Sequence, residues 1–534
     1  MVLIDNLSSP ISRLPPELLV KIFECLVTHS SPTIILRICH RWADVASSVS
    51  PLWSKIDFST PPAPLLQRCI SQPIDVILLS SPVVPTLDQR RAATYVLSHY
   101  NHCIRKLVLD LPGSHLRQIE AELSATFPIL ADVSISVKRG GMPFPSNLPE
   151  WEPAVSPPSP IRYLRIVGTL SVPWRFRNLV EFFLHDQTLV RFDPPMEAFI
   201  ETLESSPQLA VLSVTNAGPR LPLHTTLLPP AGRVIYLPNL EHLYLEQEDA
   251  CDVGWILAHL KIPISTKVRI HVDLEVGGEP TIPLGGVFDL ILPNLPGFPH
   301  LTNLRRCTYA VDSRPACVIG APNFTFCIIW SHPMRRHFDE FMMPFLRRAM
   351  AAGAIEDLTI IHHQPLEYST STLQWDKIFA TLPSLRELRV EQSPGRWDFS
   401  ILAVFQSQPS SALQDLRLSF LMFDKEPQAK GEGGNTKRMA GMLVDYCTER
   451  NQRGYRLKHL VIEAPSNPPP NLASSLAPYV DHLEIREEFF NEEDVWALEL
   501  ESRRVFNSLR APANDLDLQK TSLGGCTRRS GQTS

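Results

Sequence analysis

Histidines and cysteines are the residues whose types and spacing could support metal chemistry in this sequence. His99, His102 and Cys103 come closest to a ligand spacing, and His362 is followed directly by His363. Neighbouring side chains on a strand point to opposite faces, so His362 and His363 cannot bind the same metal ion. His99 and His102 lie at the end of a predicted helix, where an imidazole suits the negative end of the helix dipole. The sequence therefore predicts structural histidines, with no metal and no cofactor.

The motifs for phosphate binding and for serine nucleophiles are missing. The glycines between Gly431 and Lys437 lack both a preceding strand and the G-K-[ST] ending that a phosphate-binding loop needs. The sequence also has no G-x-S-x-G turn, which would expose a nucleophilic serine. We therefore predict that the chain is not an enzyme, with a site of unrecognised pattern as the disfavoured alternative.

Polar side chains on predicted strands are the candidates for binding another protein. Side chains alternate along a strand, so residues between the inward leucines point out of the sheet. Solvated charges on a strand face are the plainer alternative for any one of them. The candidate target-binding residues are His242, Tyr244, Glu246, Glu387, Arg389, Glu391, Asp415, Arg417, Ser419, His482, Glu484 and Arg486.

Leucine-rich strands recur along most of the chain and would position these residues. Leu358, Leu388 and Leu416 follow one another at a repeat distance of about 20–30 residues, which leaves room for one helix per repeat. Pro238–Leu245 and Pro383–Val390 resemble leucine-rich repeats. One strand–helix unit cannot bury its leucine face alone, whereas stacked units cover one another. The predicted fold class is α/β: a small all-α N-terminal domain, then a curved leucine-rich-repeat-like solenoid with a parallel sheet.

Amphipathic segments between the strands predict the helices of these repeats. Each has apolar residues three and four positions apart. The predicted helices are His115–Phe127, Met196–Ser205, Val253–Leu260, Phe338–Ala351, Leu373–Thr381, Ser400–Gln406 and Lys437–Arg450.

The segment from Ile11 to Phe58 has a different pattern, that of short helices. Pro16 follows Pro15 at a first helical position, where a missing N–H has no cost. Leu18, Ile22 and Leu26 then recur every four residues and form an apolar stripe. Two or three short helices of under about 50 residues are too small to bury such faces among themselves. The segment therefore predicts a partner surface.

The same segment resembles the F-box. The following segments Leu65–Val76 and His99–Asp110 also resemble those of the expanded F-box families of mushroom-type fungi. The residues that match the F-box pattern are Leu14-Pro15-Pro16-Glu17-Leu18, Ile22-Phe23, Ile38-Cys39-His40-Arg41-Trp42 and Ser50-Pro51-Leu52-Trp53. The sequence departs from the P-x-L-W form, because Pro51 directly precedes Leu52. The resemblance implies docking on a Skp-type linker protein through Leu14, Pro15, Glu17, Leu18, Ile22, Phe23, Leu26, Leu52 and Trp53. It also implies a small F-box core that contains Ile38, Cys39 and Trp42.

If the resemblance holds, the chain is a substrate-recognition adaptor of a Skp–cullin–F-box (SCF) ubiquitin ligase. The linker protein would connect it to a cullin, and the repeats would hold a target protein near a ubiquitin-charged enzyme. The alternative is an F-box protein that acts outside any ligase, as an interaction scaffold. The expected domains are a tail at 1–10, the F-box at 11–58, a linker and capping segment at 59–103, irregular leucine-rich repeats at 104–510 and a disordered tail at 511–534.

Composition restricts the partners further. The formal net charge is −6 and the sequence shows no basic patch, which argues against nucleic acid and anionic membranes as targets. No apolar run approaches the roughly 20 residues needed to cross a bilayer. The 10 cysteines form no C-x-x-C pair and suit reduced, structural thiols. We therefore expect an intracellular protein, cytoplasmic, nuclear or both.

Overall fold

The computed structural model describes the helices and strands of two compact units, Met1–Arg220 (unit 1) and Leu221–Ser534 (unit 2). The residues that it describes are 13–27, 32–49, 52, 55–57, 73–79, 87–116, 119–123, 126–138, 161–168, 176–185, 196–217, 233–247, 250–273, 299–311, 316–321, 324–329, 355–362, 379–392, 412–419, 435–464 and 468–487. Trp53 and the predicted helices at 338–351 and 400–406 lie outside these residues.

Unit 1 begins with three short helices: α1 (Pro16–Val27), the 3₁₀ helix η3 (Pro32–Arg37) and α2 (His40–Ser48). Pro16 occupies the first helical position, as predicted. Phe23 of α1 packs against Trp42 of α2 with ring centroids 5.0 Å apart. Leu19, Ile35 and Ala46 are also almost fully buried. These helices therefore have a small aromatic and aliphatic core of their own.

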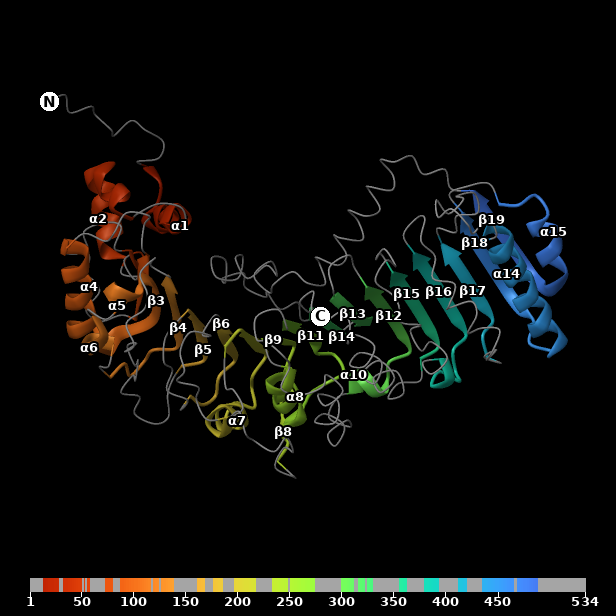
Figure 1. The fold of residues 1–534 in the computed structure, drawn as a ribbon. Helices are drawn as coiled ribbons and strands as arrows, with labels where there is room; N and C mark the ends of the chain where they lie inside the picture. Colours follow the sequence, from red (N-terminus) through yellow and green to blue (C-terminus); the bar gives the residue numbers. More distant parts are fainter. Residues whose placement is uncertain are drawn as a thin grey trace, which may run out of the picture. The chain divides into compact units, whose positions relative to one another are not determined.

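The rest of unit 1 is a parallel sheet whose strands follow the order of the sequence (Figure 1). The strands are β1 (Lys55–Asp57), β2 (Ile74–Leu79), β3 (Ile104–Pro112), β4 (Asp132–Lys138), β5 (Tyr163–Val167), β6 (Glu181–His185) and β7 (Val211–Thr215). The helices between them are α4 (Leu87–His99), η5 (Asn101–Cys103), α5 (Gly113–Leu116), α6 (Glu120–Leu123) and α7 (Met196–Glu204).

The register of this sheet aligns one apolar side chain from each strand. Leu107, Val133, Leu164, Phe182 and Leu212 are successive Cα partners, and each is buried. Burying such a row is favourable at about 25 cal/mol per Å² of apolar surface. The residues between these positions lie on the opposite face of the sheet.

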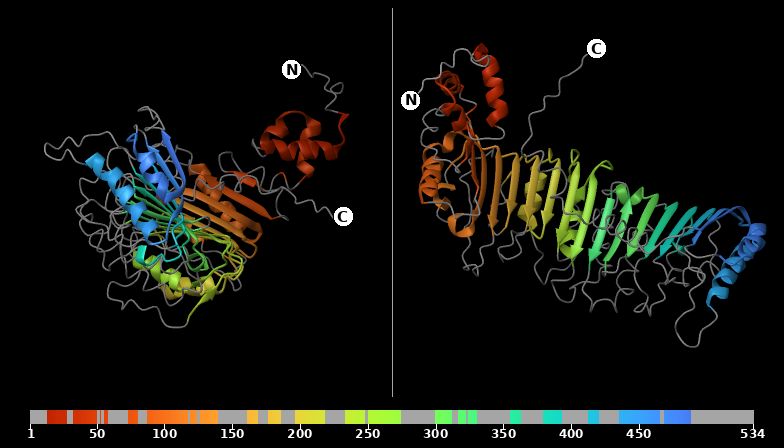
Figure 2. Two further views of the ribbon diagram at one scale, coloured as in Figure 1. Left: turned by 90° about the vertical axis from the view of Figure 1, so that its right-hand side faces the viewer. Right: turned by 90° about the horizontal axis from the view of Figure 1, so that it is seen from above.

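The main strands of unit 2 have the spatial order β9, β11, β14, β13, β12, β15, β16, β17, β18, β19. These strands are β9 (His242–Gln247), β11 (Lys267–Asp273), β12 (Arg306–Val311), β13 (Ala316–Ala321), β14 (Phe324–Ile329), β15 (Asp357–His362), β16 (Glu387–Gln392), β17 (Asp415–Ser419), β18 (Leu457–Ala464) and β19 (Val480–Glu487). Figure 2 shows its later strands, coloured green to blue, lying side by side. Leu358, Leu388, Leu416 and Leu460 are successive partners in its core row.

The remaining elements of unit 2 are short, apart from one long helix. They are β8 (Ile235–Tyr236), α8 (Ala250–Ala258), β10 (Leu260–Lys261), α10 (Pro299–Thr302), α14 (Asn435–Gln452), α15 (Leu472–Leu476) and η10 (Ala477–Tyr479). β8 and β10 form a separate parallel pair. The 18-residue helix α14 contacts β18.

These observations confirm a mixed α/β chain with parallel sheets and a helical N-terminal region. The expectation of a wholly parallel sheet was wrong at β13, which is antiparallel to both β12 and β14. The segments that join these strands, 312–315 and 322–323, are far shorter than the dozen or so residues that a parallel crossover requires.

The predicted helix His115–Phe127 was also wrong as one element, because two separate turns, α5 and α6, occupy this region. The helices predicted at Met196–Ser205, Val253–Leu260 and Lys437–Arg450 correspond to α7, α8 and α14. Among the helices that the structure describes, none is both long enough and apolar enough to cross a membrane.

Candidate functional site: two partner-binding surfaces

Helix α1 carries two apolar stripes, only one of which is covered. Leu19 and Phe23, four residues apart, are fully buried against the other helices. Leu18 and Leu26 are 45% and 41% exposed, and Ile22 between them is half-buried. At 3.6 residues per turn Leu18, Ile22 and Leu26 form one continuous strip beside the buried one. We call this strip the α1 outer face.

The start of α1 is fixed to α2 by a backbone contact. Arg41 Nη2 donates a hydrogen bond of 2.6 Å to the carbonyl oxygen of Leu14. The Leu14 side chain is half-buried, whereas Pro15 and Glu17 are exposed. Pro15 and Glu17 are therefore accessible at the start of α1, but at 100° per residue Glu17 lies about 140° around the helix from Ile22 and so outside the α1 outer face.

Two residues predicted to contact the linker lie in the interior of the helical region. Phe23 is fully buried and Leu52 is 3% exposed. The apolar pattern alone did not distinguish these positions from the exposed ones, because both α1 stripes are apolar. Phe23 and Leu52 are therefore not exposed for contact with a partner in the free chain.

The F-box core prediction also needs a correction at Ile38. Trp42 is 6% exposed and Cys39 is half-buried, but Ile38 is 48% exposed and Ile34 is 52% exposed. The helix η3 ends at Arg37, and α2 begins at His40. Ile38 lies in the break between these helices. It therefore does not belong to a helical stripe that faces the core. Ile34 and Ile38 add a second exposed apolar patch.

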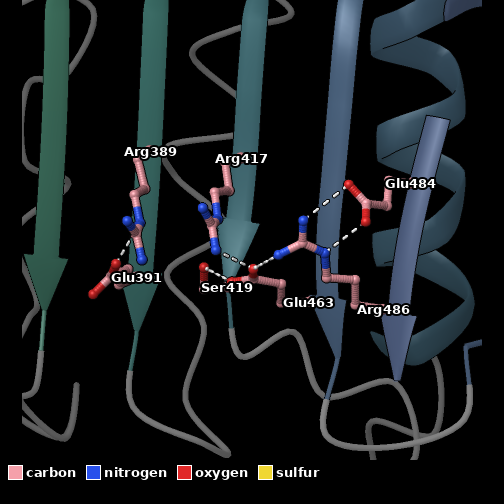
Figure 3. A network of polar contacts seen from close by, with 7 residues as sticks. All are labelled: Arg389, Glu391, Arg417, Ser419, Glu463, Glu484 and Arg486. Atoms are coloured by element: carbon pink, nitrogen blue, oxygen red, sulfur yellow. Dashed lines mark hydrogen bonds and ion pairs between the residues drawn. The ribbon is translucent and has the colours of Figure 1, made fainter. Parts of the chain in front are cut away.

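The second candidate surface is the polar face of the unit 2 sheet, where side chains from four adjacent strands meet (Figure 3). Arg389 of β16 and Arg417 of β17 are direct Cα partners. Ser419 is the partner of Glu463 on β18, and Glu463 is the partner of Arg486 on β19. We call this group the Arg–Glu network: Arg389, Glu391, Arg417, Ser419, Glu463, Glu484 and Arg486.

Glu463 is the centre of the Arg–Glu network. Its carboxylate accepts hydrogen bonds from Arg417, from Ser419 Oγ at 2.5 Å and from Arg486 Nη1 at 3.2 Å. Arg486 also donates to Glu484 at 2.7 and 3.0 Å, and Arg389 pairs with Glu391. Opposed like charges such as Arg389 and Arg417 destabilise a sheet unless they are compensated. The carboxylates of Glu391 and Glu463 supply this compensation.

Glu463 is 5% exposed and is held as an anion. Burial alone would raise the pKa of its carboxyl, but hydrogen bonds from Ser419 and Arg417 and the nearby positive charges outweigh burial and lower the pKa below its ordinary value of 4.5. A lowered folded-state pKa contributes stability that is present above the unfolded pKa and is lost as the pH falls through the folded pKa.

We expect Glu463→Gln to destabilise unit 2 by about 1–3 kcal/mol at pH 7, because it removes the buried counter-charge of two arginines. The deficit relative to wild type should shrink as the pH falls through the lowered folded-state pKa of Glu463, where the wild-type carboxyl also becomes protonated. Denaturant unfolding of both proteins at pH 7 and over a series of acidic pH values measures it. The exposed Glu387→Gln is the control, and a Glu463→Gln deficit independent of pH would contradict the assignment.

Sequence reasoning placed Arg389, Glu391, Arg417, Ser419, Glu484 and Arg486 on the outward face but missed Glu463. The signal was present, because Leu460 and Ile462 are inward positions of β18 and the next residue must point outward. His459, which pairs with Asp415, was missed for the same reason. The ring centroids of His459 and predicted His482 lie 5.8 Å apart.

The predicted face residues His242, Tyr244 and Glu246 lie on β9, which pairs with β11. Tyr244 Oη donates a hydrogen bond of 2.6 Å to Glu246, and His271 Nδ1 lies 3.2 Å from the same carboxylate. His242, at the start of β9, has its pKa lowered by burial and then by Lys267. The structure thus divides the predicted target-binding residues into two clusters within unit 2.

Metal and thiol chemistry have little support among the described residues. No group of three His, Cys, Asp or Glu side chains in this part of the chain could hold a metal ion. Cys25, Cys39, Cys103, Cys307 and Cys447 are free thiols. Burial raises the pKa of Cys307 and Cys447 to about 12, so both thiols remain protonated and pack as small apolar groups.

Comparison with known proteins identifies the helical region. Residues 11–59 match the F-box-like family, which supports an F-box protein and a role in protein–protein interaction. F-box domains generally bind Skp1-type adaptors. No curated protein matches the chain.

Proposed function

We propose that this chain is the substrate-recognition adaptor of a Skp–cullin–F-box ubiquitin ligase. The observation that carries the proposal is the α1 outer face, an apolar strip left uncovered within an F-box-like region. Full burial of an exposed leucine contributes about 1.5–3 kcal/mol to the binding free energy. A half-exposed leucine contributes only the share that corresponds to its remaining exposed surface. The Skp-type linker protein would cover this strip and connect the chain to a cullin.

The strand-rich remainder would bind the target protein. We propose that its strands form a leucine-rich-repeat-like solenoid, and that the polar faces of its sheets contact the target. The aligned leucine rows support the repeat architecture, because the leucines of adjacent strands cover one another. The adaptor would contribute no catalytic residue, because the linked enzyme supplies the chemistry and the adaptor supplies proximity. Its place of action would be the cytoplasm, the nucleus or both.

The test is affinity purification of the full chain from cells, scored for linker and cullin together. An SCF adaptor retains both proteins in comparable amounts. Retention of the linker without the cullin would replace the ligase assignment with the scaffold alternative. Loss of both would contradict the F-box assignment itself.

A further inference from the structure

Arg165 lies in the middle of β5, on the face of the unit 1 sheet opposite the apolar row. Its neighbours Leu164 and Ile166 are buried in the core, so strand alternation directs Arg165 to the other face. Its Cα partners are Ser134 on β4 and Phe183 on β6. The Arg165 side chain is half-buried, which leaves part of it accessible.

No anion accompanies this guanidinium among the described residues. Its recorded contact is with the Phe183 ring, whose centroid lies 5.9 Å from Cζ. Arg389 and Arg417, the half-buried arginines of the Arg–Glu network, pair with Glu391 and Glu463. Burial lowers the pKa of Arg165. A desolvated charge without a counter-ion is unfavourable for the free protein, so a ligand that brings the counter-ion binds favourably.

Hydroxyl groups lie on both sides of Arg165 on this face. Ser134 and Ser136 of β4 are half-buried, and Ser136 is the Cα partner of Val167 on β5. On the other side Thr215 lies on β7, beyond the intervening strand β6, and its Oγ1 is buried without a hydrogen-bond partner in the described structure. Ser134 and Ser136 are the hydroxyls on the strand next to Arg165. Hydroxyl donors beside a guanidinium form a set that can satisfy the several lone pairs of a carboxylate.

The surrounding charges favour one negative charge over two. Lys106 is already paired with Asp132 at 2.6 Å. Burial, and then the Asp132 charge, raise the pKa of Glu181, so a second negative charge on a ligand would be repelled by the carboxylates already on this face. Asp110 lies on β3 on the same face. A phosphate carries close to two negative charges at neutral pH, which a single guanidinium among carboxylates cannot balance.

We propose that Arg165 binds the carboxylate of an aspartate or glutamate side chain in an extended segment of the target protein. The guanidinium rests on Phe183, which leaves its N–H groups free to donate in the plane of the group. Val108 and Val167, half-buried on the same face, would contact apolar side chains beside the bound carboxylate. The inference rests on the proposed role of the sheets in target binding and specifies the chemistry that one of them recognises.

Displayed libraries of short random peptides test the proposal on the purified full chain. One library has a fixed central glutamate, a second has glutamine there, and a third has phosphoserine. We expect wild type to enrich the glutamate library about tenfold over the glutamine library, a difference of roughly 1.4 kcal/mol. Arg165→Met should remove this preference. Equal enrichment, absence of enrichment or stronger enrichment of phosphoserine would overturn the proposal.

Two controls separate this result from misfolding and from the proposed adaptor function. The thermal midpoint of Arg165→Met should equal or exceed that of wild type, because an unpaired, half-buried charge is removed. A lower midpoint would assign Arg165 a structural role instead. Linker binding is measured on the same preparations: its absence in wild type contradicts the adaptor function and leaves the peptide result standing.

Discussion

Replacing Leu18 and Leu26 together with glutamine will weaken binding of the Skp-type linker by about 100-fold or more. Both side chains belong to the α1 outer face and are 45% and 41% exposed in the free chain. The expected loss corresponds to roughly 2.8 kcal/mol, within the range for two leucines whose remaining surface becomes buried in a complex. Titration calorimetry with purified linker measures it.

The fold should survive this double substitution. Glutamine has nearly the same helix propensity as leucine, and neither position contributes to the Phe23–Trp42 core. Circular dichroism and the thermal midpoint should therefore match wild type. Leu14 is a poorer choice for such a test, because its backbone is bonded to Arg41 and its side chain is half-buried.

The same helix offers a matched control. Lys21 and Glu24 are exposed, and Glu24 lies about 200° around α1 from Ile22 at 100° per residue. Lys21→Gln with Glu24→Gln should bind the linker as wild type does. If both double variants bind equally well, the α1 outer face is not the docking surface. If both fail, the loss reflects the helix as a whole.

The α1 helix illustrates how far sequence reasoning reaches. The four-residue recurrence of Leu18, Ile22 and Leu26 predicted an amphipathic helix, and this prediction is confirmed. Which stripe is buried and which is exposed could not be predicted, because both the stripe of Leu18, Ile22 and Leu26 and the stripe of Leu19 and Phe23 are apolar and adjacent. The burial of each stripe depends on the position of Trp42 of α2, which is a tertiary contact.

In the sheets too, the sequence predicted which side chains share a face but not which of them pair. Strand alternation predicted that Arg389 and Arg417 share a face, because this depends only on a period of two. The partnership of Arg417 with Glu463 joins residues 46 positions apart and requires the strand order of unit 2. β17 and β18 are neighbours in the sequence as well, but their register is not given by a period of two, and elsewhere β12, β13 and β14 reverse the sequential order.

Replacing Arg450 with methionine will destabilise the C-terminal strands of unit 2 by about 2–4 kcal/mol. Arg450 lies near the end of α14 and is 1% exposed. Its Nη2 donates to the carbonyl oxygen of Leu413 at 2.6 Å, and its Nε donates to that of Tyr455 at 3.0 Å. Leu413 leads into β17, and Tyr455 follows the helix. One guanidinium thus joins the end of α14 to the start of a strand.

The expected cost follows from what the substitution leaves behind. Methionine retains most of the apolar stem but cannot donate to the two carbonyl groups, and each buried group left unsatisfied costs about 1–3 kcal/mol. The variant also removes a positive charge from the negative end of a helix. The same guanidinium lies 5.6 Å from the centroid of the Tyr446 ring, a contact that methionine replaces only in part.

Arg453, in the turn directly after α14, provides a comparison in which the charge is exposed and not buried. It is 45% exposed and pairs with Glu449 one turn earlier, so Arg453→Met should cost no more than about 0.5 kcal/mol. Hydrogen exchange of peptides covering residues 412–464 measures both variants, because it reports local opening without requiring two-state unfolding of the whole chain. Faster exchange in Arg450→Met alone is expected. Equal protection in both variants would mean that the buried guanidinium contributes no more than an exposed one, which the two short bonds to Leu413 and Tyr455 argue against.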